Sequence, residues 1–178
     1  MKKVIFTGLG ITLPMLAISL ISYGQAATNG LRFADDISSP RNAVSKSANT
    51  LNRSDVNSKA VKNFLRSFKN VSNEKWYKVD DATVAKFTSD DIDYRVYYDK
   101  KGYWLHTIRT YDEKKMKEDL RHVVRSTYYD YDINLVNEIE SPNAPATYIV
   151  QLVGKTKIMN LRICDGEMEE WQKFEKSK

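Results

Sequence analysis

The stretch that decides the fold is Tyr94-Arg95-Val96-Tyr97-Tyr98-Asp99-Lys100-Lys101-Gly102-Tyr103-Trp104-Leu105-His106-Thr107-Ile108. β-Branched and aromatic residues fill both arms, as strands prefer. Asp99 suits the first position of a type I turn, and Gly102 suits the left-handed position that follows. The stretch therefore predicts two antiparallel strands joined by a three-residue loop with a bulge.

The position of the loop decides which side chains share a face, because side chains alternate along a strand. With a loop from Lys100 to Gly102, Asp99 lies opposite Tyr103. The predicted core face then carries Tyr94, Val96, Tyr98, Trp104, His106 and Ile108. The opposite face is predicted to be solvated and carries Arg95, Tyr97, Asp99, Tyr103, Leu105 and Thr107.

A helix and two further strands precede this hairpin. Val61, Phe64, Leu65 and Phe68 recur at helical spacing, and Asn57 or Ser58 can cap the helix. Two short strands follow, bounded by turns at Asp80-Asp81 and Asp90-Asp91, and are expected over residues 74–79 and 83–87. Residues 57–111 are thus predicted to form one helix and four antiparallel strands.

The same order is predicted again over residues 112–178. Asp112 is expected to cap a helix whose buried stripe is Met116, Leu120, Val123, Val124 and Thr127. The four strands expected after this helix cover residues 133–139, 147–153, 157–164 and 167–174. Asp165-Gly166 is a two-residue hairpin signal that pairs Arg162 with Glu169 and Asn160 with Trp171.

The predicted fold is α+β, with two tandem units that each pack one helix on a four-stranded antiparallel sheet. Phe64-Leu65-Arg66-Ser67-Phe68 matches Val123-Val124-Arg125-Ser126-Thr127 in pattern, which favours an internal repeat. The alternative is one continuous α+β domain without duplication.

The start of the chain has the pattern of a secretory signal peptide. Lys2 and Lys3 precede an apolar run over residues 4–21 and then small residues, so residues 1–24 are predicted to be removed. A retained membrane anchor is the alternative. Residues 25–56 are rich in Ser, Asn, Ala, Thr and Asp, and we expect a flexible leader there.

Charge and cysteine content exclude several classes of protein. The formal charge is +5 for the 178 residues, and falls to about +3 without Lys2 and Lys3, which is too weak to indicate nucleic acid binding. The single cysteine, Cys164, cannot form an internal disulfide. It is expected to be a small, half-buried apolar residue.

No catalytic or metal-binding pattern stands out. His106 and His122 belong to no spaced ligand set, and no phosphate-binding glycine loop is present. The acidic pairs are explained by turns. We therefore expect no cofactor, no metal site and no enzymatic activity.

Several short motifs resemble a known family. They are Asn73-Glu74-Lys75-Trp76, then Val84-Ala85-Lys86-Phe87, then Tyr97-Tyr98-Asp99-Lys100-Lys101-Gly102-Tyr103-Trp104-Leu105. This order resembles the PepSY-like, β-lactamase-inhibitor-like exported proteins of Bacteroidetes, over about residues 59–174. The resemblance implies tandem helix-plus-sheet units located beyond the inner membrane. Related inhibitors grip an enzyme through the open face of such a sheet.

The sequence therefore predicts a periplasmic or secreted protein that binds a protein or peptide partner through open sheet faces. Contact with a membrane is expected only through the signal peptide before cleavage. The candidate contact residues are Arg95, Tyr97, Tyr103, Leu105, Arg162 and Trp171, since exposed Tyr, Trp and Arg favour binding. The alternatives are an envelope ligand or glycan-binding protein, and then a hydrolase with a carboxylate site that sequence spacing does not reveal.

Overall fold

A computed structural model of the chain describes residues 49–176. The predicted signal peptide and most of the predicted leader lie outside this range. The described helices are two short 3₁₀ helices, η1 (Arg53–Asp55) and η2 (Glu113–Lys115), and two α-helices, α2 (Ser58–Ser67) and α3 (Glu118–Thr127). The strands are β1 (Asn49–Leu51), β2 (Lys75–Val79), β3 (Ala82–Ser89), β4 (Ile92–Tyr98), β5 (Trp104–Tyr111), β6 (Asp132–Glu140), β7 (Thr147–Val153), β8 (Lys157–Cys164) and β9 (Glu167–Glu175).

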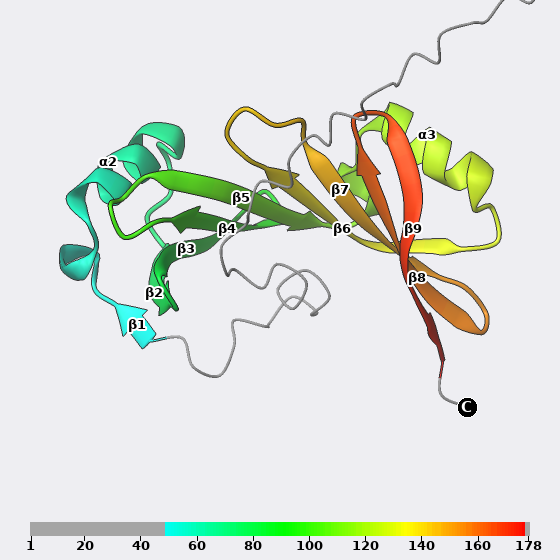
Figure 1. Cartoon of the computed structure of the whole chain (residues 1–178), viewed down its shortest axis with the longest axis horizontal. Coiled ribbons are helices and arrows are strands. Elements are labelled where there is room, and N and C mark those ends of the chain that lie inside the picture. Colours follow the sequence, from blue (N-terminus) through cyan, green and yellow to red (C-terminus); the bar gives the residue numbers. More distant parts are fainter. Residues whose placement is uncertain (1–48, 177–178) are drawn as a thin grey trace, which may run out of the picture. The chain divides into compact units, whose positions relative to one another are not determined.

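All nine strands belong to one antiparallel sheet, in which each strand pairs with its neighbours in the sequence (Figure 1). Two-residue turns make this order possible. Asp165 and Gly166 both have positive φ, at 52° and 80°, as a type I′ hairpin requires. Asp90 and Asp91 repeat this conformation with φ of 51° and 61°. The predicted α+β class with antiparallel strands is confirmed.

The start of α2 is as predicted, and the start of α3 is not. The Asn57 side chain caps α2 by accepting a hydrogen bond from the Lys59 amide at 3.0 Å. Asp112 caps the three-residue η2 and not one longer helix. Met116 has extended backbone angles and separates η2 from α3. Met116 is buried in that conformation, so packing outweighs the continuous helical pattern.

Both α-helices pack on the same face of the sheet, which we call the helix face. Under α2, Ala60 and Phe64 join a core that includes Trp76, Phe87 and Tyr98. Under α3, Val124 and Met116 join a second core that includes Val136, Val150 and Leu161. Cross-strand pairing from Tyr94–Arg109 through Arg109–Glu138 to Glu138–Tyr148 puts both cores on one side. Val123 and Thr127, expected in the stripe, are exposed.

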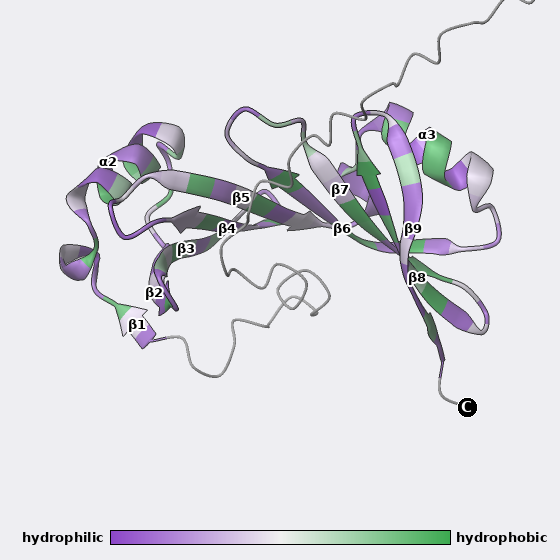
Figure 2. Ribbon diagram, in the orientation of Figure 1, coloured by the Kyte–Doolittle hydropathy of each residue, from purple (hydrophilic) through white to green (hydrophobic). Residues whose placement is uncertain are grey.

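Strand hydropathy alternates, as Figure 2 shows by the change of colour from residue to residue along several strands. The alternation is displaced where a strand carries an extra residue. In β5 this residue is Leu105: Tyr98 pairs with Trp104 as expected, but Tyr97 pairs with His106 and Val96 with Thr107. The predicted register is therefore wrong by one residue beyond Tyr98, and His106 and Ile108 face away from the helices.

A second bulge displaces the last hairpin. Arg162 pairs with Glu169 as predicted, but Asn160 pairs with Gln172 and the register passes over Trp171. Residues 49–56 were expected to belong to a flexible leader. In the structure Asn49–Leu51 forms β1 and Arg53–Asp55 forms η1. No helix in the described range 49–176 meets the length and hydropathy needed to cross a membrane.

Candidate functional site

The face of the sheet opposite α2 and α3 is the candidate site, and we call it the open face because no described helix or strand lies over it. Side-chain alternation from the observed pairs assigns its members. They include Tyr77, Val84, Lys86, Arg95, Tyr97, His106, Ile108, Thr110, Asn137, Ile139, Ile149, Gln151, Asn160 and Arg162.

The centre of the open face is apolar. Val84, Tyr97 and Ile108 form a cluster on adjacent strands. Partly buried Leu105 and Ile139 pack against this cluster. All three residues of the cluster are buried, so it forms the floor of the open face and is not an exposed apolar patch.

A row of polar groups crosses strands β4 to β6 beside this cluster. The Tyr97 ring stacks on the His106 imidazole with centroids 4.2 Å apart. Arg95 Nη2 donates to Thr110 Oγ1 at 3.3 Å, and Thr110 Oγ1 donates to Asn137 Oδ1 at 2.6 Å. Burial, with a smaller effect from the charge of Arg95, lowers the pKa of His106 to about 4. His106 is therefore neutral at pH 7.

The β8–β9 part of the open face is polar and more exposed. Asn160 Nδ2 donates to Gln172 Oε1 at 2.9 Å, and Arg162 Nη1 donates to Glu169 Oε1 at 2.8 Å. The pair Arg162–Glu169 is exposed on both sides. It can exchange its internal ion pair for one with a partner at little cost.

Four of the predicted contact residues lie on or beside the open face, Tyr103 lies beside α2, and Trp171 falls in the bulge of β9. Arg95, Tyr97 and Arg162 belong to it, and Leu105 packs against its centre. Tyr97 is only 4% exposed, so it forms part of the floor and is not the solvated residue that was expected.

Tyr103 is the clearest departure. It is 57% exposed, and the Lys59 ammonium group of α2 lies 5.1 Å from its ring centroid, which places it beside that helix. Trp171 is the extra residue of the β9 bulge. Sequence reasoning missed His106 and Thr110 because the bulge at Leu105 exchanges the two faces of β5, and it assigned no face to Asn137 on β6.

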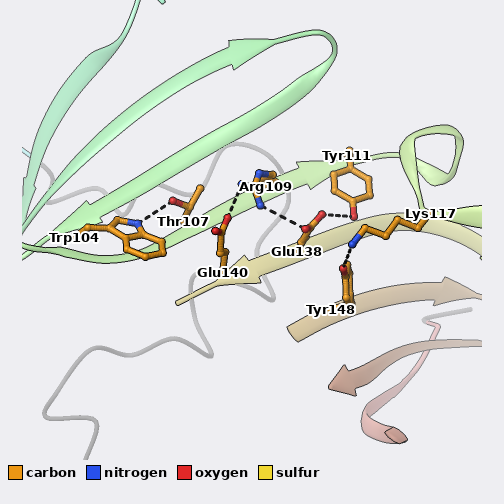
Figure 3. Close-up of polar contacts among 8 residues, drawn as sticks. All are labelled: Trp104, Thr107, Arg109, Tyr111, Lys117, Glu138, Glu140 and Tyr148. Carbon is orange, nitrogen blue, oxygen red and sulfur yellow. Dashed lines mark hydrogen bonds and ion pairs between the residues drawn. The ribbon is translucent and has the colours of Figure 1, made fainter. Parts of the chain in front are cut away.

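The helix face carries a polar strip between its two cores (Figure 3). Arg109 donates to Glu138 at 3.4 Å and to Glu140 at 2.6 Å, and the Tyr111 hydroxyl donates to Glu138 at 2.9 Å. Burial opposes the charge of Arg109, but the hydrogen bond to Glu140 and both carboxylates raise its pKa above the usual value. These groups satisfy one another, so the strip is assigned a structural role.

The strip continues toward α3. Lys117, the residue before α3, donates to the Tyr148 hydroxyl at 2.9 Å. At the other end, Trp104 Nε1 donates to Thr107 Oγ1 at 3.0 Å. Burial and the neighbouring Glu138 raise the pKa of Tyr111 above its usual value. The hydroxyl therefore stays protonated as a hydrogen-bond donor at neutral pH.

Within residues 49–176, no group of three or more His, Cys, Asp or Glu side chains could hold a metal ion. His122 is exposed on α3. Cys164 is half-buried and its sulfur lies 3.3 Å from Thr147 Oγ1, which donates to it. Neither residue forms part of a recognisable reactive pair.

Comparison with known proteins identifies the fold. No family profile and no curated protein matches the sequence. A BLIP-like protein from Bacteroides fragilis matches in structure, with a TM-score of 0.54 and 18% identity, over 64% of this chain and 84% of the other. A DUF2874 family protein from Bacteroides ovatus matches with a TM-score of 0.55 and 13% identity, over 64% and 86%.

A third match is a protein from Bacteroides eggerthii, described provisionally as periplasmic. Its TM-score is 0.54 at 11% identity, over 66% of this chain and 87% of the other. At these identities the likeness establishes the fold alone. The chain thus has the fold of BLIP-like and DUF2874 proteins.

Proposed function

We propose that this chain is an exported, non-catalytic protein that binds a protein or peptide partner through the open face. The observation that carries the proposal is the placement of both α-helices on the helix face. The other face of a nine-stranded sheet then presents an apolar centre bordered by Arg95, Lys86 and Arg162. Interfaces commonly combine an apolar centre with a polar rim.

The similarity of this fold to that of known proteins supports the proposed binding role. Its BLIP-like and provisionally periplasmic neighbours fit a binding protein of the cell envelope. We place the chain in the periplasm or outside the cell, in a BLIP-like group that the sequence motifs also relate to PepSY-like proteins. Inhibition or modulation of an envelope enzyme is the role that this fold favours.

Internal duplication is part of the proposal. Each 3₁₀ helix has three residues and each α-helix ten, and the second set starts 60 positions after the first, from Arg53 to Glu113 and from Ser58 to Glu118. Phe64 and Val124, also 60 positions apart, are both fully buried. We propose that two helix-plus-sheet units joined edge to edge, which doubled the area of the open face.

Charge reversal on the open face tests the binding role. Arg162→Glu should weaken capture of the envelope partner by roughly tenfold, because arginine is enriched among the residues that dominate interfaces. Affinity capture from envelope extract, followed by a binding titration with the captured protein, measures this.

The matched control is Arg66→Glu, which reverses an exposed arginine on α2. It should leave affinity unchanged. Equal affinity of the wild type and Arg162→Glu, or an effect confined to Arg66→Glu, would place the interface elsewhere.

A further inference from the structure

The two edges of the sheet differ in length. β1 at one edge has three residues, whereas β9 at the other edge has nine. Among the described strands none pairs with the outer side of β9, and most of the β9 side chains are exposed. A long, exposed edge strand is a template for pairing with another chain.

The ladder with β8 fixes which residues of β9 turn their backbone groups outward. In an antiparallel ladder, hydrogen-bonded and non-hydrogen-bonded pairs alternate. The Lys176 amide donates to the Thr156 carbonyl at 2.8 Å, and Glu167 closes the two-residue turn opposite Cys164. Alternation from these two pairs leaves four residues with outward backbone groups, two on each side of the bulge at Trp171. They are Met168, Glu170, Lys173 and Glu175.

The order of charges along β9 is self-complementary. In the antiparallel alignment that places Glu170 of one copy opposite Lys173 of another, Glu167 also faces Lys176. Two-fold symmetry forms each of these pairs twice. Opposite charges directly across two strands stabilise the pairing, and like charges destabilise it.

The remaining acidic residues of β9 meet no like charge in this alignment. Glu169 faces Phe174, and Glu175 faces Met168. Charged residues and bulges on an edge strand commonly prevent pairing. Here the charges attract in one alignment, so they do not protect the edge against a second copy.

The alignment also fits a continuous sheet, in which directly opposed residues lie on the same face. Glu170 pairs with Leu161 and Lys173 with Met159, and both β8 residues belong to the core under α3. Glu170 and Lys173 therefore share the helix face, although they are three positions apart. The extra residue Trp171 makes this possible, and both copies carry it at the centre of the alignment.

We propose that β9 is a dimerisation edge, to which a second copy of this chain adds its own β9 in the alignment that pairs Glu170 with Lys173. Both residues turn their backbone groups outward, so they form a hydrogen-bonded pair between the copies. This inference goes beyond the proposed function and does not depend on the open face binding a partner.

The ion pair that these residues form within one chain does not prevent the exchange. Lys173 Nζ donates to Glu170 Oε2 at 2.8 Å, and the two side chains are 44% and 46% exposed. Exposed ion pairs contribute little stability. Replacing this pair by the same pair between copies therefore costs little.

Exchanging charges between copies tests the alignment. In the predicted mature chain, Glu170→Lys opposes two lysines and Lys173→Glu opposes two glutamates. Each variant alone should raise the dimer dissociation constant by roughly tenfold. A mixture of the two variants should recover the affinity of the wild type, because unlike copies restore both opposite-charge pairs. Within each variant chain the two charges stay alike, so only pairing between copies explains recovery.

Sedimentation velocity over a concentration series measures the dissociation constants, under reducing conditions that keep Cys164 from cross-linking. Circular dichroism of each variant checks that the fold is kept. The matched controls are Lys62→Glu on α2 and Asp81→Lys in the turn before β3, which reverse exposed charges away from β9. Both controls should keep the affinity of the wild type.

Cysteine cross-linking reports the register directly. In a Cys164→Ser background, Glu169→Cys combined with Phe174→Cys should form a covalent dimer on oxidation, because these positions face each other between copies. Glu167→Cys combined with Phe174→Cys, displaced by two positions on the same face, should cross-link much less.

A wild type that stays monomeric throughout the concentration series would overturn the proposal. So would a mixture that dissociates as readily as the single variants, or single variants with unchanged affinity. Equal cross-linking of the two cysteine pairs, or none from the first, would contradict the alignment.

Discussion

At the residue scale, Gly102 joins the central hairpin to α2. Its φ is 80°, and a Cβ there would lie 2.6 Å from Asn57 Oδ1 and 2.9 Å from the Ala60 amide nitrogen. Asn57 cannot easily move, because it caps α2 and donates to the Lys100 carbonyl at 3.2 Å. One glycine thus sets both the turn and the approach of the hairpin to the helix.

Gly102→Ala should therefore destabilise the fold more than Gly166→Ala. Gly166 has the same φ of 80° but nothing within 4 Å of an added Cβ. We expect a loss of about 1–2 kcal/mol at Gly166 from the backbone conformation alone, and a larger loss at Gly102. Denaturant unfolding of both variants measures the difference, and equal losses would contradict the tight contact with α2.

His106 predicts a pH dependence with a defined sign. Its pKa is about 4 in the fold against 6.5 for the free group. Between these values the unfolded chain binds the proton and the folded chain does not. The free energy of unfolding therefore falls as pH decreases from 6.5 toward 4, by up to about 3 kcal/mol.

Unfolding titrations from pH 7 to 4 on two variants isolate this effect. His106→Gln should flatten the slope in that window, while His122→Gln should keep the slope of the wild type. The carboxylates contribute equally to the pH dependence of unfolding in the wild type and in both variants. A wild-type slope in His106→Gln would show that the imidazole is not buried in its neutral form.

At the scale of elements, the polar strip connects β5 to β6 between the two cores. Arg109 is 26% exposed and Glu138 16%, whereas Arg162 and Glu169 on the open face are 45% and 59% exposed. Arg109→Met should cost about 1–3 kcal/mol, since it leaves a partly buried carboxylate with one donor fewer. Arg162→Met should cost less than about 1 kcal/mol.

Thermal or denaturant unfolding checks this prediction. Adding Glu138→Gln to Arg109→Met should recover part of the loss, because it removes the charge left without its cation. Equal costs for Arg109→Met and Arg162→Met would contradict the structural role of the strip.

Sequence patterns predicted the elements better than their registers. Asp165-Gly166 and Asn57 are local signals, and the turn and the helix start follow from them directly. The bulges at Leu105 and Trp171 have no such signal, because the flanking residues suit either face of a strand. Sheet twist and packing decide where such a residue is inserted. The composition of the open face therefore depends on packing that the local sequence pattern does not encode.

Short elements were also beyond sequence reasoning. β1 has three residues, Asn49–Leu51, which is too short for a period to be recognised. Met116 fits a helical stripe, yet it is buried in extended backbone ahead of α3. In both cases contacts distant in sequence override the local pattern.

At the scale of the whole described chain, we propose that the open face is the interaction surface. Both α-helices cover one side of the sheet, and sequential pairing of nine strands extends the other side. Tyr77 pairs with Val84 and therefore lies on the open face. Its side chain is partly exposed. Tyr129 follows α3, outside the open face, and is 84% exposed.

Replacing each of these tyrosines by a photoreactive benzoylphenylalanine gives the most direct test. Crosslinking in the envelope of the source organism should trap a partner from position 77 and none from position 129. The same adduct from position 129, together with none from position 77, would contradict the assignment of the open face as the binding surface.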